Sequence, residues 1–226
     1  MRVALITGAS AVPVPGTEGV PARLGPVLLP LYVDPAVDPA AWRAAGGRPG
    51  ELTVVVPDPG CAEAAGCLAR TGTTVLGRVD AGFAVRPVTD LLNDVRRWAG
   101  QPVAGVFLDR TPTSPFCLGP VALAIRAARR AGLSTVVLNP GVPADPLYRE
   151  LGVPICTFEG AWPDYQRWSG EGSRPGDGHL VHSVPATSLP VAHALVRERQ
   201  AGFGLVTDRK PPAQYAGLPA WLPPAG

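Results

Sequence analysis

Polar side chains recur at one kind of position along this chain, the end of an apolar segment. Eight apolar segments of about seven residues each end in groups that can ionise or hydrogen-bond: Tyr32 and Asp34, Asp58, Asp80, Asp109 with Arg110, Asn139, Glu159, His182 with Ser183, and Thr207 with Asp208. A single Asp after a strand is often a helix N-cap, which suffices for Asp58 or Asp208 taken alone. Capping explains eight polar ends less easily. A ring of carboxylates and donors suits a neutral polyhydroxylated ligand, which means a sugar.

Aromatic side chains and one histidine near these ends add to the expected sugar site. Exposed aromatic side chains such as Tyr32, Phe83, Trp162 and Trp168 could stack on sugar faces. Packing of a helix against the sheet is the alternative, and for Trp98 and Trp168 it is at least an equal one. His182 could reach a substrate hydroxyl or be a satisfied core histidine.

The apolar segments that carry these residues alternate along the chain with segments of helical pattern. Apolar runs of strand length are predicted at Val27–Val33, Leu52–Asp58, Thr74–Asp80, Val103–Asp109, Ser134–Pro140, Pro154–Gly160, His179–Pro185 and Gly202–Asp208. Helical patterns lie between them, at Pro39–Ala45, Cys61–Arg70, Val88–Ala99, Leu118–Ala131, Asp145–Leu151, Trp162–Trp168 and Leu189–Gln200. Eight such units in about 200 residues predict a single α/β domain, a (β/α)8 barrel of the TIM type. A doubly wound open sheet is the alternative. In a barrel all eight polar ends meet at one mouth.

The composition supports a folded chain. Glycine and proline supply 27 and 28 of the 226 residues and charged residues only 17%, but hydrophobic residues supply 46%. The glycines and prolines fall largely between the predicted elements, where they end strands and form turns. We expect an irregular leader over residues 1–25 and the barrel over residues 26–226. The apolar start is short and runs into Pro13 and Pro15, so it does not resemble a signal peptide, and we expect a cytoplasmic location by default unless the start is misplaced.

Several function classes are disfavoured by the sequence. The net charge of +2 argues against electrostatic binding to nucleic acid. No apolar run approaches the length of a membrane span, so we expect no membrane partner. The four cysteines form no CxxC pair, so we predict separate small buried side chains and no metal site. The start lacks the glycines of a dinucleotide-binding loop. We therefore expect no cofactor, and a monomer.

A series of short sequence segments, in a fixed order along the chain, resembles a known family. LLPLYVDP, VVVPDPG, TTVLGRVDAGFAVRP, VAGVFLDR, TVVLNPG, ICTFEG and VTDRKPPAQYAGLPAW follow one another over about residues 27–222. In this order they resemble the spherulation-specific family 4, or spherulin-4-like, proteins, which are related to fungal glycoside hydrolases that cut galactosamine-containing polysaccharide. The resemblance implies a (β/α)8 barrel and an endo-acting hydrolase of amino-sugar glycans.

The resemblance also implies which acids carry out catalysis. The family's proposed acids are an Asp-Glu pair ending the fourth strand and a Glu ending the sixth, which match Asp109 and Glu159 here, whereas Arg110 stands where the pair has its Glu. Glycoside hydrolysis usually needs two carboxyl groups. If Arg110 approached Asp109 in space it would favour the ionised carboxylate, and Glu159 would then be the acid, its pKa raised by Phe158 and Trp162.

Three functional hypotheses follow. The first is hydrolysis of an amino-sugar polysaccharide by Asp109 and Glu159, with Tyr32, Asp58, Asp80, Arg110, Asn139, Trp162, His182 and Asp208 as candidate substrate-binding residues. The second is a non-catalytic carbohydrate-binding barrel, or pseudoenzyme, because of Arg110. The third is another chemistry in which Arg110 binds an anionic sugar. The orientation of the Arg110 side chain discriminates among them.

Overall fold

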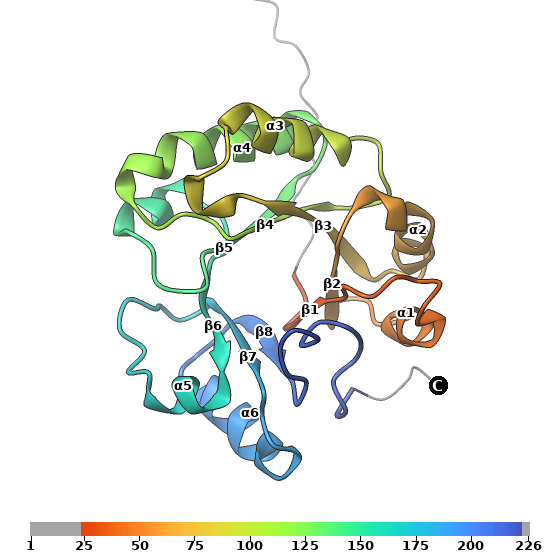
Figure 1. Ribbon diagram of the computed structural model, residues 1–226, viewed down its shortest axis with the longest axis vertical. Helices are drawn as coiled ribbons and strands as arrows, with labels where there is room; N and C mark the ends of the chain where they lie inside the picture. The colour runs from red at the N-terminus through yellow and green to blue at the C-terminus, as the bar shows by residue number, and fades with distance from the viewer. Residues whose placement is uncertain (1–23, 223–226) are drawn as a thin grey trace, which may run out of the picture.

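The fold is a barrel of eight parallel strands, seen in a computed structural model that describes residues 24–222 (Figure 1). The strands are β1 Val27–Pro30, β2 Leu52–Val56, β3 Thr74–Asp80, β4 Gly105–Asp109, β5 Thr135–Asn139, β6 Cys156–Ala161, β7 Gly178–His182 and β8 Phe203–Val206. All eight predicted strands are confirmed, some of them shorter than expected. The leader predicted for residues 1–25 falls almost wholly outside the described residues.

The sheet closes between its first and last strands. The order is β5-β4-β3-β2-β1-β8-β7-β6, and β1 pairs with both β2 and β8. This closure confirms the barrel and rejects the open doubly wound sheet. The remaining seam, between β5 and β6, carries only one isolated bridge, Leu138 with Ile155. The barrel is therefore nearly closed, and its one weak seam runs up to the ends of two strands with polar termini.

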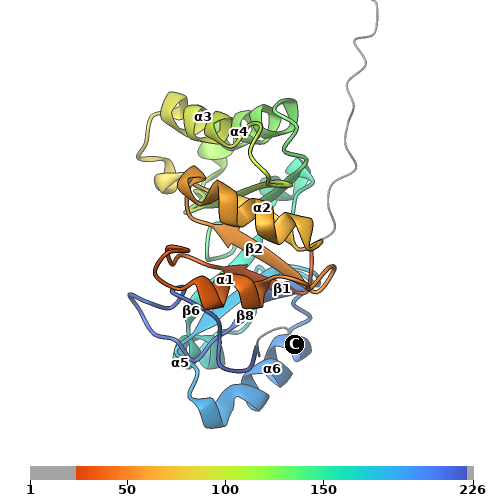
Figure 2. The same ribbon diagram turned by 90° about the vertical axis from the view of Figure 1, so that its right-hand side faces the viewer.

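Helices cover the outside of the barrel. They are α1 Pro39–Ala45, α2 Ala62–Arg70, α3 Val88–Arg97, α4 Leu118–Arg130, α5 Trp162–Arg167 and α6 Leu189–Glu198, with short 3-10 helices η1 Pro59–Cys61, η2 Gly82–Ala84, η3 Pro115–Cys117, η4 Pro146–Leu151 and η5 Ala186–Ser188. Figures 1 and 2 show α3 and α4 together beside β3–β5, and α5 and α6 near β6–β8. The helix predicted at residues 145–151 forms as the 3-10 helix η4.

Tight packing on the outer face fixes the strand that leads to the site. A Cβ atom added at Gly77, in β3, would lie 2.2 Å from Cδ2 of Trp98, so the buried indole ring requires glycine there. Trp98 Nε1 also donates a hydrogen bond to the carbonyl oxygen of Arg78, at 3.0 Å. Because side chains alternate along a strand, Arg78 then points to the other face, into the barrel. The packing of Trp98 thus sets where the guanidinium lies.

No helix among residues 24–222 is both long and apolar enough to cross a bilayer.

Candidate active site

Asp109 is the last residue of β4 and lies in the mouth of the barrel. The strand register places Asp80, Asp109 and Asn139 side by side on three neighbouring strands. The carboxylate accepts three hydrogen bonds: from Arg78 Nε at 2.7 Å, from Asn139 Nδ2 at 3.0 Å and from the backbone N–H of Arg110 at 3.0 Å. All three groups are donors, so a fully deprotonated carboxylate satisfies them best.

Glu159 faces this carboxylate from β6. The Tyr215 hydroxyl donates a hydrogen bond to Oε1 at 2.6 Å, and Asn139 Nδ2 donates one to Oε2 at 2.6 Å. Burial raises the pKa of Glu159, the nearby Asp109 raises it further, and the bonds from Tyr215 and Asn139 offset part of the rise. The predicted direction of the pKa shift is confirmed. Phe158 and Trp162, the expected source of the shift, belong to a second apolar cluster packed with Tyr165 of α5.

Asn139 joins the two acids across the weak seam of the barrel. Its Nδ2 bonds both carboxylates, so the nearest oxygens of Asp109 and Glu159 lie no farther apart than the two bonds together, 5.6 Å. Its Oδ1 atom is buried and has no hydrogen-bond partner among the described residues. Gly141 supports the arrangement, because its carbonyl accepts the Glu159 N–H at 2.8 Å and a Cβ there would lie only 3.3 Å from Glu159 Cβ.

Two residues of the site escaped the sequence analysis, Arg78 and Tyr215. Arg78 lies two residues before Asp80, so the alternation of strand side chains could have placed it in the barrel. Tyr215 comes from the segment after β8, which returns beside β1 in Figure 1. The backbone carbonyl of Tyr215 accepts a hydrogen bond from the N–H of Tyr32 at 2.7 Å. The rings of Tyr32 and Tyr215 meet edge to face at 5.6 Å, and the guanidinium of Arg78 lies 5.2 Å from the Tyr32 ring centre. No spacing in the sequence marks Tyr215.

Arg110 turns its side chain away from the two acids. Its Nε donates to Asp80 Oδ1 at 2.8 Å, and its Nη2 pairs with Asp80 Oδ2. Burial acts to raise the pKa of Asp80, but the bonds from Arg110 and from the N–H of Gly82 outweigh it and hold that pKa below its usual value. The backbone N–H of Arg110 still donates a hydrogen bond to the Asp109 carboxylate. Arg110 therefore occupies the rim of the mouth, and its guanidinium does not separate Asp109 from Glu159.

The structure brings six of the ten predicted site residues together: Tyr32, Asp80, Asp109, Arg110, Asn139 and Glu159. The other four have contacts elsewhere. Asp58 caps η1 through the N–H of Gly60, at 2.7 Å, and Asp208 accepts from the N–H of Ala220 at 3.2 Å. His182 bonds its neighbour Ser183 at 3.0 Å, and burial lowers its pKa. Trp162 is only 5% exposed, so the expectation of an exposed stacking surface there is wrong.

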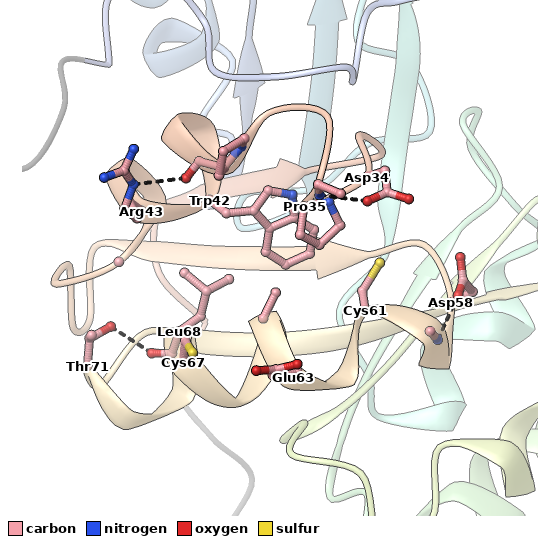
Figure 3. Close-up of a pocket in the computed structure, with 15 residues that line it drawn as sticks. Asp34, Pro35, Trp42, Arg43, Asp58, Cys61, Glu63, Cys67, Leu68 and Thr71 are labelled. Atoms are coloured by element: carbon pink, nitrogen blue, oxygen red, sulfur yellow. Dashed lines mark hydrogen bonds between the residues drawn. The ribbon is translucent and has the colours of Figure 1, made fainter.

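A separate hollow lies between two of the outer helices. It encloses about 660 Å³ between α1 and α2, and Figure 3 shows Trp42, Glu63 and Leu68 along it, with Asp34 and Asp58 toward the ends of β1 and β2. Neither Asp109 nor Glu159 lines it. The polar side chains that meet around Asp109 and Glu159 are therefore separate from this groove.

The four cysteines are free thiols that differ in their burial. Cys61 and Cys156 are buried thiols, but Cys67 is exposed and Cys117 partly exposed, so the prediction that all four are buried is wrong. Within residues 24–222 no three His, Cys, Asp or Glu side chains are grouped as a metal site would require.

A family model gives the family of this chain, and one solved structure shares its fold. The model of Spherulin4, the spherulation-specific family 4, matches residues 26–223. Sph3 from Aspergillus clavatus, solved in complex with GalNAc, aligns with a TM-score of 0.73 and 23% identity over 91% of this chain and 96% of that chain. Dihydrodipicolinate synthase from Rhodopseudomonas palustris aligns with a TM-score of only 0.43 and 16% identity over 83% and 72% of the two chains. A search of curated protein sequences returns no match.

Proposed function

Since the chain belongs to the spherulation-specific family 4, we propose that it is a glycoside hydrolase acting on amino-sugar-containing polysaccharide. The observation that carries the proposal is the pair formed by Asp109 and Glu159, whose nearest oxygens are at most 5.6 Å apart across one amide group. Two carboxyl groups in one mouth are what this reaction needs. The relative Sph3, solved with GalNAc, supports the class of sugar.

Glu159 is the proton donor in this proposal. Burial raises the pKa of its carboxyl group, so a larger share of it holds a proton near neutral pH than of an exposed Glu. The protonated carboxyl transfers its proton to the glycosidic oxygen as the bond to the sugar breaks. Tyr215 and Asn139 hold the two oxygens in place, and both can keep a hydrogen bond when Glu159 becomes a carboxylate.

Asp109 is the nucleophile: its carboxylate bonds to the anomeric carbon as the leaving sugar takes the Glu159 proton, and water, which gives a proton back to Glu159, then hydrolyses this glycosyl ester. The three donors to the Asp109 carboxylate orient it and leave the deprotonated form satisfied. Retaining enzymes place their two carboxyl groups about 5–5.5 Å apart and inverting enzymes about 6.5–9.5 Å, to make room for a water molecule. The bridged pair is closer to the first geometry. We therefore expect the product to keep the anomeric configuration of the substrate, which nuclear magnetic resonance of the early product can establish.

The test of the proposal is hydrolysis of α-linked galactosamine-type oligosaccharides by the purified chain. Asp109→Asn and Glu159→Gln should each remove almost all of the rate, because each keeps the shape of the side chain and removes its acid-base chemistry. Equal residual rates in the wild type and both variants would overturn the assignment. A carbohydrate-binding barrel without catalysis, the alternative raised by Arg110, would instead bind these oligosaccharides and release no product.

A further inference from the structure

The segments that follow β3 and β4 hold an unusual run of strained backbone beside the acids. Gly82, Phe83 and Ala84 have φ of 59°, 50° and 68°, and Arg110 has φ of 51°. Residues other than glycine seldom adopt this left-handed region, and they persist there when the surroundings over-determine it. Here the N–H of Phe83 donates to the carbonyl of Arg110 at 2.7 Å, which ties the two strained segments together.

This backbone holds an aromatic ring out in solvent. Phe83 is 53% exposed, and the Arg110 guanidinium carbon lies 5.8 Å from its ring centre. Asp80 takes two donors of that guanidinium and also accepts the N–H of Gly82 at 2.8 Å. The result is one exposed apolar ring with the guanidinium of a charge-balanced ion pair over one side of it, which leaves the other side open. The Arg110 backbone N–H, bonded to Asp109 at 3.0 Å, joins this group directly to the acid pair.

We propose that Phe83, Asp80 and Arg110 form a binding subsite for a neutral pyranose unit, next to the sugar that is cleaved between Asp109 and Glu159. The proposal rests on the proposed function. The apolar C–H face of a pyranose covers an aromatic ring, and its hydroxyl groups can bond the remaining guanidinium N–H groups and the Asp80 oxygens. An acidic sugar fits less well, because Asp80 already pairs with Arg110 and would repel a second carboxylate.

The experiment measures binding in a Glu159→Gln parent, which should cleave its ligand too slowly to disturb the titration. An α-linked N-acetylgalactosamine hexasaccharide and free N-acetylgalactosamine are titrated by calorimetry. Phe83→Ala should weaken hexasaccharide binding about tenfold, as loss of a buried aromatic contact typically does. The matched control is Phe116→Ala, because Phe116 is 95% exposed in η3, the segment after β4, and should leave the affinity within about twofold. We expect free N-acetylgalactosamine to occupy the cleavage position and therefore to bind all variants alike.

The outcomes separate the subsite from the activity. Equal hexasaccharide affinity for the parent and Phe83→Ala overturns the subsite, as does an absence of binding by the parent. Tighter binding of an oligogalacturonate than of the neutral hexasaccharide overturns its neutral character. Binding that depends on Phe83 while the wild type cleaves nothing supports the subsite and overturns the hydrolase. Thermal melting of each variant checks that the fold is kept.

Discussion

Two polar networks in this molecule use similar side chains to different ends. One lies in the mouth around Asp109 and Glu159. The other lies on the outer side of β6 and β7, where His179 bonds Tyr165 at 2.8 Å and Ser173 at 3.2 Å, and where Asp177 pairs with Arg149. Stacked aromatic rings of α5 and its following segment cover the outer network. Both networks contain a buried carboxylate, a hydroxyl and a guanidinium, so residue type alone does not identify the active site.

The difference lies in which groups are left unsatisfied. In the outer network the partners satisfy one another: burial acts to raise the pKa of Asp177, but Arg149 and neighbouring donors hold it below its usual value. In the mouth, two carboxyl groups share one amide, the pKa of Glu159 is raised, and the buried Oδ1 of Asn139 has no partner among the described residues. An unsatisfied buried polar group costs stability and calls for an explanation. A role in binding substrate would explain the unsatisfied amide oxygen in the mouth, whereas the outer network needs no explanation beyond its contribution to the stability of the fold.

The largest expected effect comes from changing the proton donor of the mouth. Glu159→Gln should lower the rate of hydrolysis by about 10²–10⁴, the usual contribution of general acid catalysis. The thermal midpoint should stay the same or rise, because a buried carboxyl with a raised pKa is costly to ionise. Rates on the galactosamine oligosaccharide and a thermal melt measure both. A large loss of stability would instead show that Glu159, like Asp177, mainly stabilises the fold.

The reverse pattern is expected for Asp177→Asn in the outer network. Asp177 is 5% exposed, and removing its charge leaves Arg149 without its partner. Breaking a buried pair in this way typically costs about 3–5 kcal/mol of unfolding free energy. The rate per folded molecule should be unchanged. Urea unfolding and an active-fraction assay measure the two quantities, and a lost rate with intact stability would contradict the comparison.

The two networks should also respond oppositely to pH. Burial lowers the pKa of His179 to about 4 from 6.5, so the unfolded chain takes up this proton first as the pH falls. Stability should therefore drop between pH 6.5 and about 4, by about 3 kcal/mol from this residue. Glu159 has a raised pKa, so its contribution is present at low pH and lost as the pH rises. Unfolding free energies across this range for the wild type and His179→Gln test the slope, which should flatten in the variant.

Tyr215→Phe should have a moderate effect that reports on the mouth alone. Tyr215 is a positioning residue, because its hydroxyl orients Glu159 and lowers the pKa of that carboxyl. Losing one such bond should reduce kcat about tenfold, on the order of 1.4 kcal/mol. It should also raise the pKa of Glu159 further, so the alkaline fall of the rate should move to higher pH. An unshifted pH profile would show that Tyr215 does not act through Glu159.

The sequence predicted the architecture well because local pattern and global fold agree in this chain. Each apolar run is short, is bounded by glycine or proline, and alternates with a helical pattern, so the eight strands and the polar residues at their ends could be predicted. Asn139 and Glu159 are neighbours in the mouth because the order of strands in a barrel makes them so. Arg78 could be placed only from the side-chain alternation in β3.

Other features depend on contacts that no local pattern encodes. Tyr215 reaches Glu159 because the segment after β8 returns beside β1, and no periodicity marks that path. Trp162 looked like an exposed ring because it follows a strand end, yet α5 buries it against the outer cluster. The direction of the Arg110 side chain depends on a left-handed backbone and on Asp80, thirty positions earlier in the chain.

The smallest expected effect on catalysis concerns Arg110 itself. Arg110→Glu introduces the acid that the family resemblance implies at this position, but the side chain here points toward Asp80 and away from Glu159. If Glu159 is the proton donor, kcat at saturating substrate should change by less than about threefold, since the transition-state contacts of the acid pair are unchanged. The melting temperature should fall slightly, because two carboxylates would replace an ion pair. A large gain in kcat would instead show that the wild-type mouth lacks its acid, and the chain would then be a binding protein. Arg110→Gln, which removes the charge and adds no acid, separates a restored proton donor from mere loss of the guanidinium.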